Sequence, residues 1–263
     1  MKIVTWNVNS IRAREARLLS WLEREQPDVM CLQELKVTDA DFPFDVLQEA
    51  GYRAAAFGQK TYNGVAILSK SEATNVSRGM DDGVDDPQAR LIQAEVEGVR
   101  FVNCYFPNGK EVGSPKYEYK LSWMKRLVAH LKRTASPSDD LVLCGDFNVA
   151  LFENDVANPE KWQDSVLRHH QVREALEAIG DWGLTDVFRM HHPGGGVYSW
   201  WDYRMLGFPK GDGLRIDHIY ATESIARRCS SARVDRDERK GQKPSDHAPV
   251  IAEIAPVIAD SRD

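Results

Sequence analysis

The sequence predicts a single α/β domain built on two β-sheets that pack face to face. Strand-like and helix-like segments mix along all 263 residues, and no Pro/Gly/Ser-rich linker divides them. Two apolar runs, IVTWNVNS at 3–10 and LVLCGDFNVA at 141–150, each end in polar residues and lead into a loop. This short echo favours two similar sheets whose strands end in similar polar positions.

The first half of the chain predicts two helices among several buried strands. Ser10 can cap a helix over about 11–25, because apolar residues recur on one stripe and Pro27 follows the end. A short helix is expected around 46–50, before Gly51. Strand-like runs lie at 2–7, 28–34, 52–57 and 64–69, and 90–108 resembles a hairpin that turns near Gly98.

The second half continues the mixture of helices and strands. Apolar side chains at helical spacing predict a helix from Tyr117 to about Thr134, and a further helix is expected from about Val166 to Ile179. Strands are expected at 141–147, 214–221 and 249–254.

Composition predicts no membrane segment and leaves the binding partner open. Lys plus Arg number 34 against 40 Asp plus Glu, which gives a net charge of -6. No apolar stretch approaches the length of a membrane span, and the chain opens on a strand-like run with no signal-peptide pattern. The four cysteines form no CxxC pair, which favours reduced thiols and a cytoplasmic location.

Many of the predicted strands end in, or begin after, polar residues. These are Asn7, Asn9, Glu34, Tyr105, Asn108, Asp146, Asn148, Asp217, His218, Asp246 and His247. Each alone is explained by a turn or a helix cap, but together we expect them to converge on a site.

Four of these side chains are carboxylates: Glu34, Asp146, Asp217 and Asp246. Brought together they would repel one another, and a hard cation would remove the repulsion. Oxygen ligands without cysteine indicate Mg²⁺, for which Mn²⁺ can substitute, rather than zinc. A neighbouring histidine is then either a metal ligand or a donor to a phosphoryl oxygen.

Nine segments carry a resemblance to a known family. In order they are IVTWNVNSIRAR, PDVMCLQELK, NGVAILSK, NCYFPNG, LVLCGDFNVA, GLTDVFR, YSWWDYR, RIDHIY and SDHAPV. In these segments the chain resembles exonuclease III–type apurinic/apyrimidinic (AP) endonucleases of the endonuclease/exonuclease/phosphatase superfamily. The resemblance covers nearly the whole chain. It implies a DNase I-like four-layer α/β sandwich, two mixed sheets with helices outside, as one domain over 1–256 with a short tail over 257–263.

The resemblance also implies a metal region and a catalytic set. The implied metal region is Asn7, Glu34, Asp146, Asn148, Asp246 and His247, with Glu34 as the main Mg²⁺ ligand. The implied catalytic residues are Tyr105, Asp146, Asn148, Asp217 and His247. Asp146 would orient or deprotonate the attacking water, and Asn148 would donate to the phosphoryl group. His247, oriented by Asp217, would press an imidazolium against the scissile phosphate, with Tyr105 close by.

Four residues are implied to contact DNA: Asn108, Trp200, Lys36 and Arg173. Trp200 would wall a pocket for a flipped-out abasic sugar, whereas a plain surface lysine is the alternative for Lys36. The chain departs from the family pattern in two places. Asn9 stands where some members carry an acid, and the sequence of the segment 150–172 differs from the one usual in the family.

The sequence therefore predicts a Mg²⁺-dependent DNA repair phosphodiesterase that resembles exodeoxyribonuclease III. It would cleave double-stranded DNA 5′ to abasic sites and remove nucleotides or blocking groups from 3′ ends, as a cytoplasmic monomer without a membrane partner. Two alternatives stay open: a superfamily phosphatase acting on inositol phosphates or lipids, and a non-catalytic DNA-binding relative.

Overall fold

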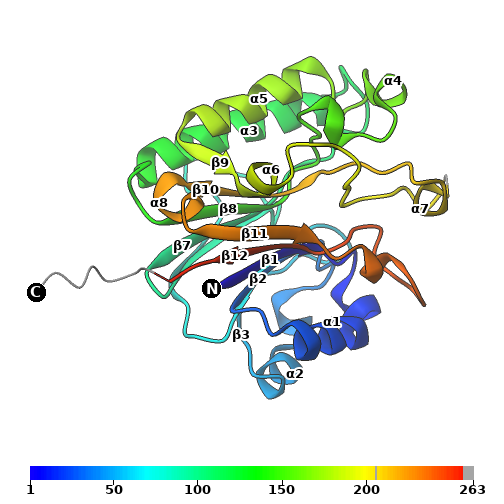
Figure 1. Ribbon diagram of the computed structural model, residues 1–263. Coiled ribbons are helices and arrows are strands. Elements are labelled where there is room, and N and C mark those ends of the chain that lie inside the picture. The colour runs from blue at the N-terminus through cyan, green and yellow to red at the C-terminus, as the bar shows by residue number, and fades with distance from the viewer. Residues whose placement is uncertain (205, 257–263) are drawn as a thin grey trace, which may run out of the picture.

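The protein is built on two six-stranded sheets packed face to face, with helices on the outer side of each (Figure 1). This computed structural model describes residues 1–204 and 206–256, so the expected tail over 257–263 lies outside the described residues. The expected four-layer α/β sandwich is confirmed. Within the described ranges, no helix is long and apolar enough to cross a bilayer.

The two sheets share one strand pattern. The first sheet has the order β11-β12-β1-β2-β4-β3, and the second has the order β5-β6-β7-β8-β10-β9. The strands of the first sheet are β1 (Lys2–Asn7), β2 (Val29–Gln33), β3 (Arg53–Phe57), β4 (Val65–Ser69), β11 (Cys229–Val234) and β12 (Val250–Ile254). Those of the second are β5 (Thr74–Arg78), β6 (Leu91–Val96), β7 (Val99–Tyr105), β8 (Leu141–Asp146), β9 (Leu184–Asp186) and β10 (Asp217–Thr222).

A central parallel pair in each sheet carries the polar strand ends. β1 pairs parallel with β2 and antiparallel with β12, and β8 pairs parallel with β7 and antiparallel with β10. The carboxyl ends of each parallel pair therefore share an edge with the start of the antiparallel neighbour. The echo between 3–10 and 141–150 thus marks equivalent strands of the two sheets.

Helices cover both outer faces (Figure 1). α1 (Ile11–Glu25) and α2 (Phe44–Glu49) lie on the first sheet, and α3 (Pro115–Thr134) and α5 (His170–Asp181) lie on the second. As expected, the Ser10 side chain caps α1 by accepting from the backbone N–H of Ala13. The short helices are α4 (Pro159–Trp162), α6 (Val187–His191), α7 (Gly207–Lys210) and α8 (Glu223–Ala226), and the 3-10 turns are η1 (Asp39–Asp41), η2 (Glu153–Asp155) and η3 (Arg236–Arg239).

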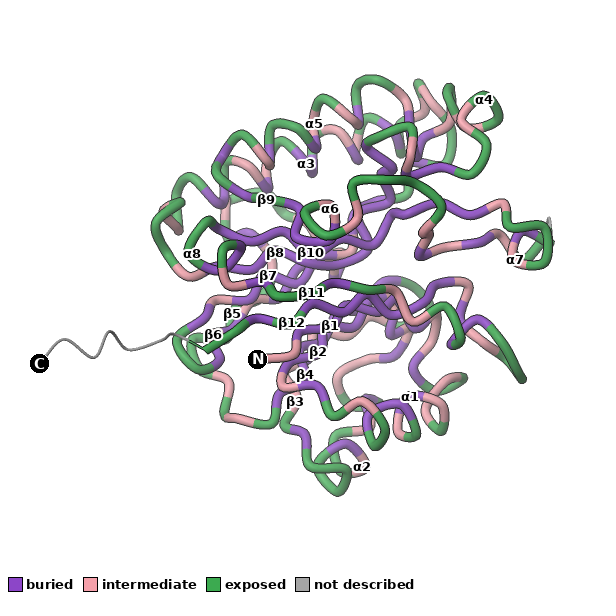
Figure 2. The backbone as a smooth tube through the Cα atoms, in the orientation of Figure 1, coloured by how far each residue is buried: buried purple, intermediate pink, exposed green. Residues whose placement is uncertain are grey.

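Three apolar layers hold the sandwich together. They include Ile3, Val29 and Cys144 between the sheets, Leu127, Leu143 and Leu176 under α3 and α5, and Trp6, Trp21 and Leu22 under α1. Figure 2 shows the buried strands running through the middle of the molecule. Because each fully buried Leu or Val contributes about 1.5–3 kcal/mol, these layers fix the strands to which the polar ends are attached.

Some element boundaries differ from expectation. The helix expected from about Val166 begins at His170, because 163–169 forms turns closed by the carbonyl of Ser165. The strand expected over 214–221 begins only at Asp217. The edge strands β5 and β11 were not expected. All five residues of β5 are exposed, so no alternation of buried and exposed side chains marks this strand.

Candidate active site

The polar strand ends meet in one cavity of about 520 Å³. Of the predicted site residues, its walls contain Glu34, Tyr105, Asn108, Asp146, Asn148, Trp200, Asp246 and His247. Asn7 and Asp217 are buried behind them and hydrogen-bond to residues of the wall. Segments from both sheets, far apart in the chain, therefore deliver their polar side chains to one place, as the sequence predicts.

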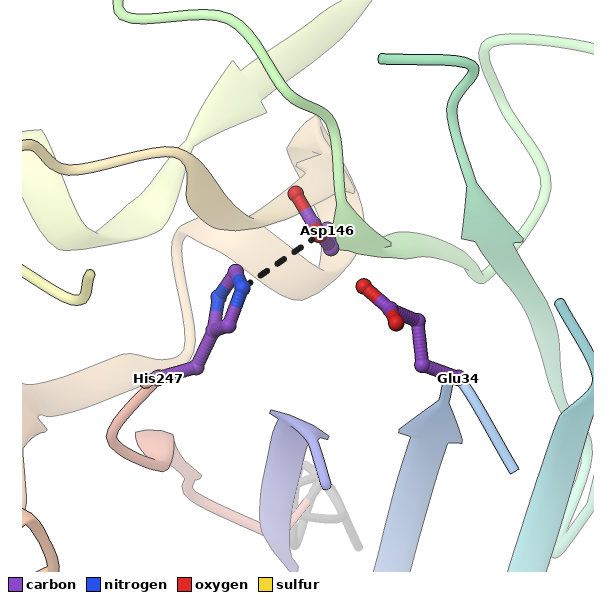
Figure 3. A group of neighbouring side chains, drawn as sticks. All are labelled: Glu34, Asp146 and His247. Atoms are coloured by element: carbon purple, nitrogen blue, oxygen red, sulfur yellow. Dashed lines mark ion pairs between the residues drawn. The ribbon is translucent and has the colours of Figure 1, made fainter. Parts of the chain in front are cut away.

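Glu34 and Asp146 face each other where the two sheets meet (Figure 3). The side-chain amide of Asn7 donates to both carboxylates, at 2.9 Å to Glu34 Oε1 and at 2.9 Å to Asp146 Oδ2. Glu34 leaves β2 with φ 52°, a left-handed conformation that costs an L-residue roughly 1–2 kcal/mol. Strain of this kind is typical of functional sites, where the surrounding contacts sustain it.

His247 is held as a cation by two acids. Its Nδ1 lies 2.8 Å from Asp217 Oδ2, and its Nε2 lies 3.7 Å from Asp146 Oδ2. The hydroxyl of Ser199 donates to Asp217 Oδ2 at 2.6 Å and fixes that carboxylate in turn. Burial opposes a charge here, but Asp217 and Asp146 outweigh it and raise the pKa of His247 to about 10. The ring is therefore an imidazolium at neutral pH.

Asp146 is an acid whose charge is poorly compensated. Burial raises the pKa of Asp146 to about 7, and the charges of Asp217 and Glu34 act in the same direction. His247 and the Asn7 hydrogen bond oppose the increase without cancelling it. A carboxyl group with a pKa near neutrality can exchange protons at physiological pH, which suits a general base.

Tyr105 and two asparagines add hydrogen-bonding groups. The Tyr105 hydroxyl donates to Glu34 Oε1 at 3.0 Å, and burial, together with Glu34 and Asp146, raises the pKa of Tyr105 well above its ordinary value. The side chain is therefore a phenol, not a phenolate. Asn108 Nδ2 donates to Asn148 Oδ1 at 3.1 Å, so the loops after β7 and β8 are joined at the cavity wall.

Asp246 has its own hydrogen-bond partners, which differ from those of Glu34 and Asp146. Its two oxygens accept from Asn9 Nδ2 at 2.8 Å and from the Trp200 indole N–H at 3.0 Å. Burial would raise the pKa of Asp246, but His247 and these hydrogen bonds lower it. Asp246 thus stays ionised, and it fixes the Trp200 ring beside the cavity.

Lys36 and Arg173 lie differently with respect to the cavity. Lys36 Nζ is 2.8 Å from Glu34 Oε2, so the lysine contacts the carboxylate pair and is not a free surface residue. Arg173 lies on α5, and its Nε donates to the carbonyl of Arg168 at 3.1 Å. The structure therefore brings Lys36 to the site and leaves Arg173 outside the lining of the cavity.

Sequence reasoning misses three residues that shape the cavity. Ser199 orients Asp217, as described above. Trp162 packs edge-on against Trp200, with 5.7 Å between the ring centroids. Lys120 lies fully buried beneath the loops that carry Asn108 and Asn148. It is the only one of the three that the sequence could have indicated, because it is a lysine on the apolar face of a predicted helix.

The donor set fits a hard divalent cation. Ligand atoms of Glu34, Asp146 and His247 lie within 4.8 Å of one another. The repulsion that helps to raise the pKa of Asp146 is the repulsion that a cation relieves. Carboxylate and amide oxygens suit Mg²⁺ and Mn²⁺, whereas an imidazolium has no free lone pair for a metal. The carboxylates that could hold the ion are those of Glu34 and Asp146. Asn7 directs its Nδ2 at both of them, while its Oδ1 accepts from the backbone N–H of Asn9.

Two packed sheets that carry acids, amides and a charged histidine at their shared edge are typical of metal-dependent hydrolases of the α/β sandwich class. The chain belongs to the endonuclease/exonuclease/phosphatase family, which it matches over residues 4–247. It is 35% identical to the exodeoxyribonuclease III of Haemophilus influenzae, over 97% of this chain and 100% of that protein.

Two solved structures share the fold over nearly the full chain. An AP endonuclease from Archaeoglobus fulgidus is 40% identical with a TM-score of 0.94, over 97% of this chain and 99% of that one. A 3′ phosphatase from Neisseria, bound to a product DNA hairpin, is 42% identical with a TM-score of 0.93 over the same shares, 97% and 99%.

Proposed function

We propose that this protein is a DNA repair hydrolase that cleaves phosphodiester bonds 5′ to abasic sites and removes nucleotides or blocking groups from DNA 3′ ends. The observation that carries the proposal is the grouping of Glu34, Asp146 and His247 in one cavity. The names of the similar proteins, exodeoxyribonuclease III, AP endonuclease and 3′ phosphatase, support the same substrate.

Asp146 is the proposed base. Hydrogen bonds from Asn7 and from the backbone N–H of Asn148 fix the direction of its carboxylate, which would take the proton from the attacking water. A general base of this kind contributes about 10²–10⁴-fold to a rate.

The other side chains stabilise the charge that builds up on the phosphoryl group. His247 supplies a positive charge, and Tyr105 and Asn148, which also line the cavity, supply hydrogen-bond donors. Donors placed where charge develops are worth several kcal/mol because they need no reorganisation during the reaction. His247 thus acts as an imidazolium, which we favour over a role as metal ligand.

Mg²⁺, or Mn²⁺ in its place, would supply Lewis-acid stabilisation of a phosphoryl oxygen and of the leaving 3′ oxygen. Glu34 and Asp146 would hold it, and Asn7 would keep both carboxylates in place through its Nδ2. The amide of Asn9 offers one negative charge fewer than an acid, so we expect a single ion bound weakly. Lys36 competes for Glu34 at 2.8 Å and would turn toward DNA once the ion is bound.

The aromatic wall suits a nucleotide that lacks a base. Trp200 is fixed by its hydrogen bond to Asp246 and by the ring of Trp162. Extruding an abasic sugar from a duplex costs less than extruding a stacked nucleotide, which favours this substrate. Asn108 would bind a backbone phosphate, and Arg173 would contact DNA beyond the cavity. We place the protein in the cytoplasm as a monomer with one domain over 1–256.

Two duplexes test the proposal, one with a single abasic analogue and one with a 3′ phosphate, each with Mg²⁺ and with a chelator. We expect incision on the 5′ side of the lesion and release of the phosphate, both abolished by the chelator and by Glu34→Gln. Glu23→Gln, an exposed acid on α1, is the matched control and keeps full activity.

Other outcomes separate the alternatives. Turnover of inositol phosphates without cleavage of either duplex would overturn the proposal in favour of a phosphatase. Binding of both duplexes with no cleavage under any metal condition would indicate a non-catalytic relative.

A further inference from the structure

Lys120 is a charged residue on the buried face of α3, with 0% of its surface exposed. Its neighbours one turn away on that face, Tyr117 and Met124, are buried as well. Burying an ammonium group costs several kcal/mol unless its hydrogen bonds are well made. A lysine at such a position therefore calls for a specific set of partners.

Those partners are three backbone carbonyls. Lys120 Nζ donates to Asn148 O at 2.7 Å, to Val166 O at 2.7 Å and to Asn108 O at 3.2 Å. Burial lowers the pKa of Lys120 to about 7, against the opposing charge of Asp146. In its protonated form the amine has three N–H groups, and the three carbonyls take all of them. The carbonyls belong to the loop after β7, the loop after β8 and the turns before α5, which are three separate walls of the cavity.

The stem of Lys120 is packed as closely as its head. Gly109 has φ +96°, which favours glycine, and a Cβ at this position would lie 3.2 Å from Lys120 Cδ. The loop that carries Asn108 therefore passes directly over the lysine stem. A change in the stem is transmitted to that loop.

Asn108 and Asn148 are coupled, so a change at Lys120 would move both of them. Asn108 Nδ2 donates to Asn148 Oδ1 at 3.1 Å, and Asn148 has φ 50°, a left-handed conformation that asparagine tolerates. The ammonium of Lys120 holds the carbonyl of that residue. Losing this bond would free both loops at once.

We propose that Lys120 is a positioning residue for DNA cleavage. It does not touch the substrate, and it fixes Asn108 and Asn148 where they meet the phosphoryl group; this inference rests on the proposed function. A misplacement of about 1 Å can lower a rate about 100-fold, so the loss of Lys120 acts chiefly on kcat.

A double-mutant cycle with Lys120→Met and Asn148→Ala tests the inference. Folding is checked by circular dichroism and thermal unfolding, and kcat and KM are measured on the abasic duplex with Mg²⁺. We expect Lys120→Met alone to lower kcat by about 100-fold. In the Asn148→Ala background the same change should lower kcat by less than about twofold, because coupled residues are not additive. Lys132→Met, an exposed lysine in the last turn of α3, is the control and leaves kcat unchanged.

If Lys120→Met does not fold, Lys120→Gln takes its place in the cycle, because glutamine keeps two N–H donors. Equal effects with and without Asn148, an unchanged kcat in a folded variant, or loss of the fold in both variants would each show that the lysine only stabilises the structure. Failure of the unsubstituted protein to cleave the duplex would instead overturn the proposed function.

Discussion

Two polar clusters lie on opposite sides of β10, and neighbouring residues of this strand serve different clusters. The cavity cluster consists of Glu34, Asp146, Asp217 and His247, and the arginine cluster consists of Asp155, Asp186, Arg189, Arg215 and His218. Asp217 points toward His247, whereas His218 points the other way, with its Nδ1 3.0 Å from Arg215. Side chains alternate between the two faces along a strand, which separates the two clusters.

The acids of the arginine cluster have resident cations. Arg215 donates to Asp155 Oδ1 at 2.7 Å and to Asp186 Oδ2 at 2.7 Å, and Arg189 also binds Asp155. Burial alone would raise the pKa of Asp186, but Arg215 and His218 outweigh it and lower the pKa well below its ordinary value. Asp186 is fixed as an anion.

In the cavity cluster, Asp146 and Asp217 share one imidazolium, and the pKa of Asp146 is raised to about 7. One type of side chain, aspartate, therefore behaves differently on the two sides of β10. Asp186 stays an anion, whereas the pKa of Asp146 lies close to neutral pH. The fold completes the charge balance where the acids only support structure. It leaves the balance incomplete where a proton or a cation has to be exchanged.

The largest effect is expected from Asp146→Asn. Loss of the base should lower cleavage of the abasic duplex by about 10³-fold, as measured in single-turnover kinetics. Because the variant removes a poorly compensated buried charge, its unfolding temperature in chelator should be equal or higher. Asp181→Asn, an exposed acid at the end of α5, is the control. A clear loss of stability in Asp146→Asn would break the contrast between the clusters.

Arg215→Met should act on stability instead. Asp155 and Asp186 would stay buried without their main cation, so the free energy of unfolding should fall by about 3–5 kcal/mol in urea denaturation. Arg227→Met removes an exposed ion pair with Glu223 and should cost less than about 0.5 kcal/mol. A similar small loss for Arg215→Met would mean that the arginine cluster is not a structural support.

Asp217→Asn should have an intermediate effect on activity. The variant keeps the hydrogen bond to His247 but removes a charge that holds the imidazolium, so the pKa of His247 should fall in an NMR titration. A lost interaction of about 1.4 kcal/mol would lower the rate about tenfold. An unchanged pKa would show that Asp217 only orients the ring.

The smallest change in any single measurement is expected in the pH dependence of stability, whose slopes should have opposite signs in the two clusters. The pKa of Asp186 is lowered in the folded state, so its contribution is present above about pH 4 and is lost as the pH falls. The pKa of Asp146 is raised, so between about pH 4 and about pH 7 the folded state keeps a proton that the unfolded state has released, and stability falls as the pH rises.

The opposite pH dependences can be measured with Asn variants at the two positions, in the presence of a chelator. Relative to the unsubstituted protein, Asp186→Asn should lose stability as the pH rises toward about 4 and show a constant deficit above it. Asp146→Asn should gain stability between about pH 4 and 7. Each change is at most about 1.4 kcal/mol per pH unit. Denaturant unfolding at several pH values measures both. Slopes of the same sign would contradict the contrast.

The sequence predicts the cavity cluster far better than the arginine cluster. The cavity residues stand at the ends of recognisable apolar strands, where a polar side chain is unexpected and therefore informative. Arg215 and Asp155 lie instead within a strand-like run and within the atypical segment 150–172, where nothing distinguishes them from surface residues. His218 was expected to converge on the site with the other polar residues. This expectation is wrong, because the residue after Asp217 faces the opposite side of the sheet.

Secondary structure follows the same rule. The bounds of α1 are predicted correctly, because Ser10 and Pro27 are local signals. The start of α5 is not, because the preceding turns are held by a tertiary contact, the bond from Lys120 to Val166. The edge strand β5 has no burial pattern to detect, because all five of its residues are exposed.

The pairing of β1 with β12 joins residues 2–5 to residues 250–253. During synthesis on the ribosome, the first strand therefore has no partner until residues 250–253 have been translated. His247 also emerges only at that stage, so a nascent or interrupted chain holds Asn7 and Glu34 but no imidazolium. A chain that stops before residue 247 therefore cannot assemble the cavity cluster.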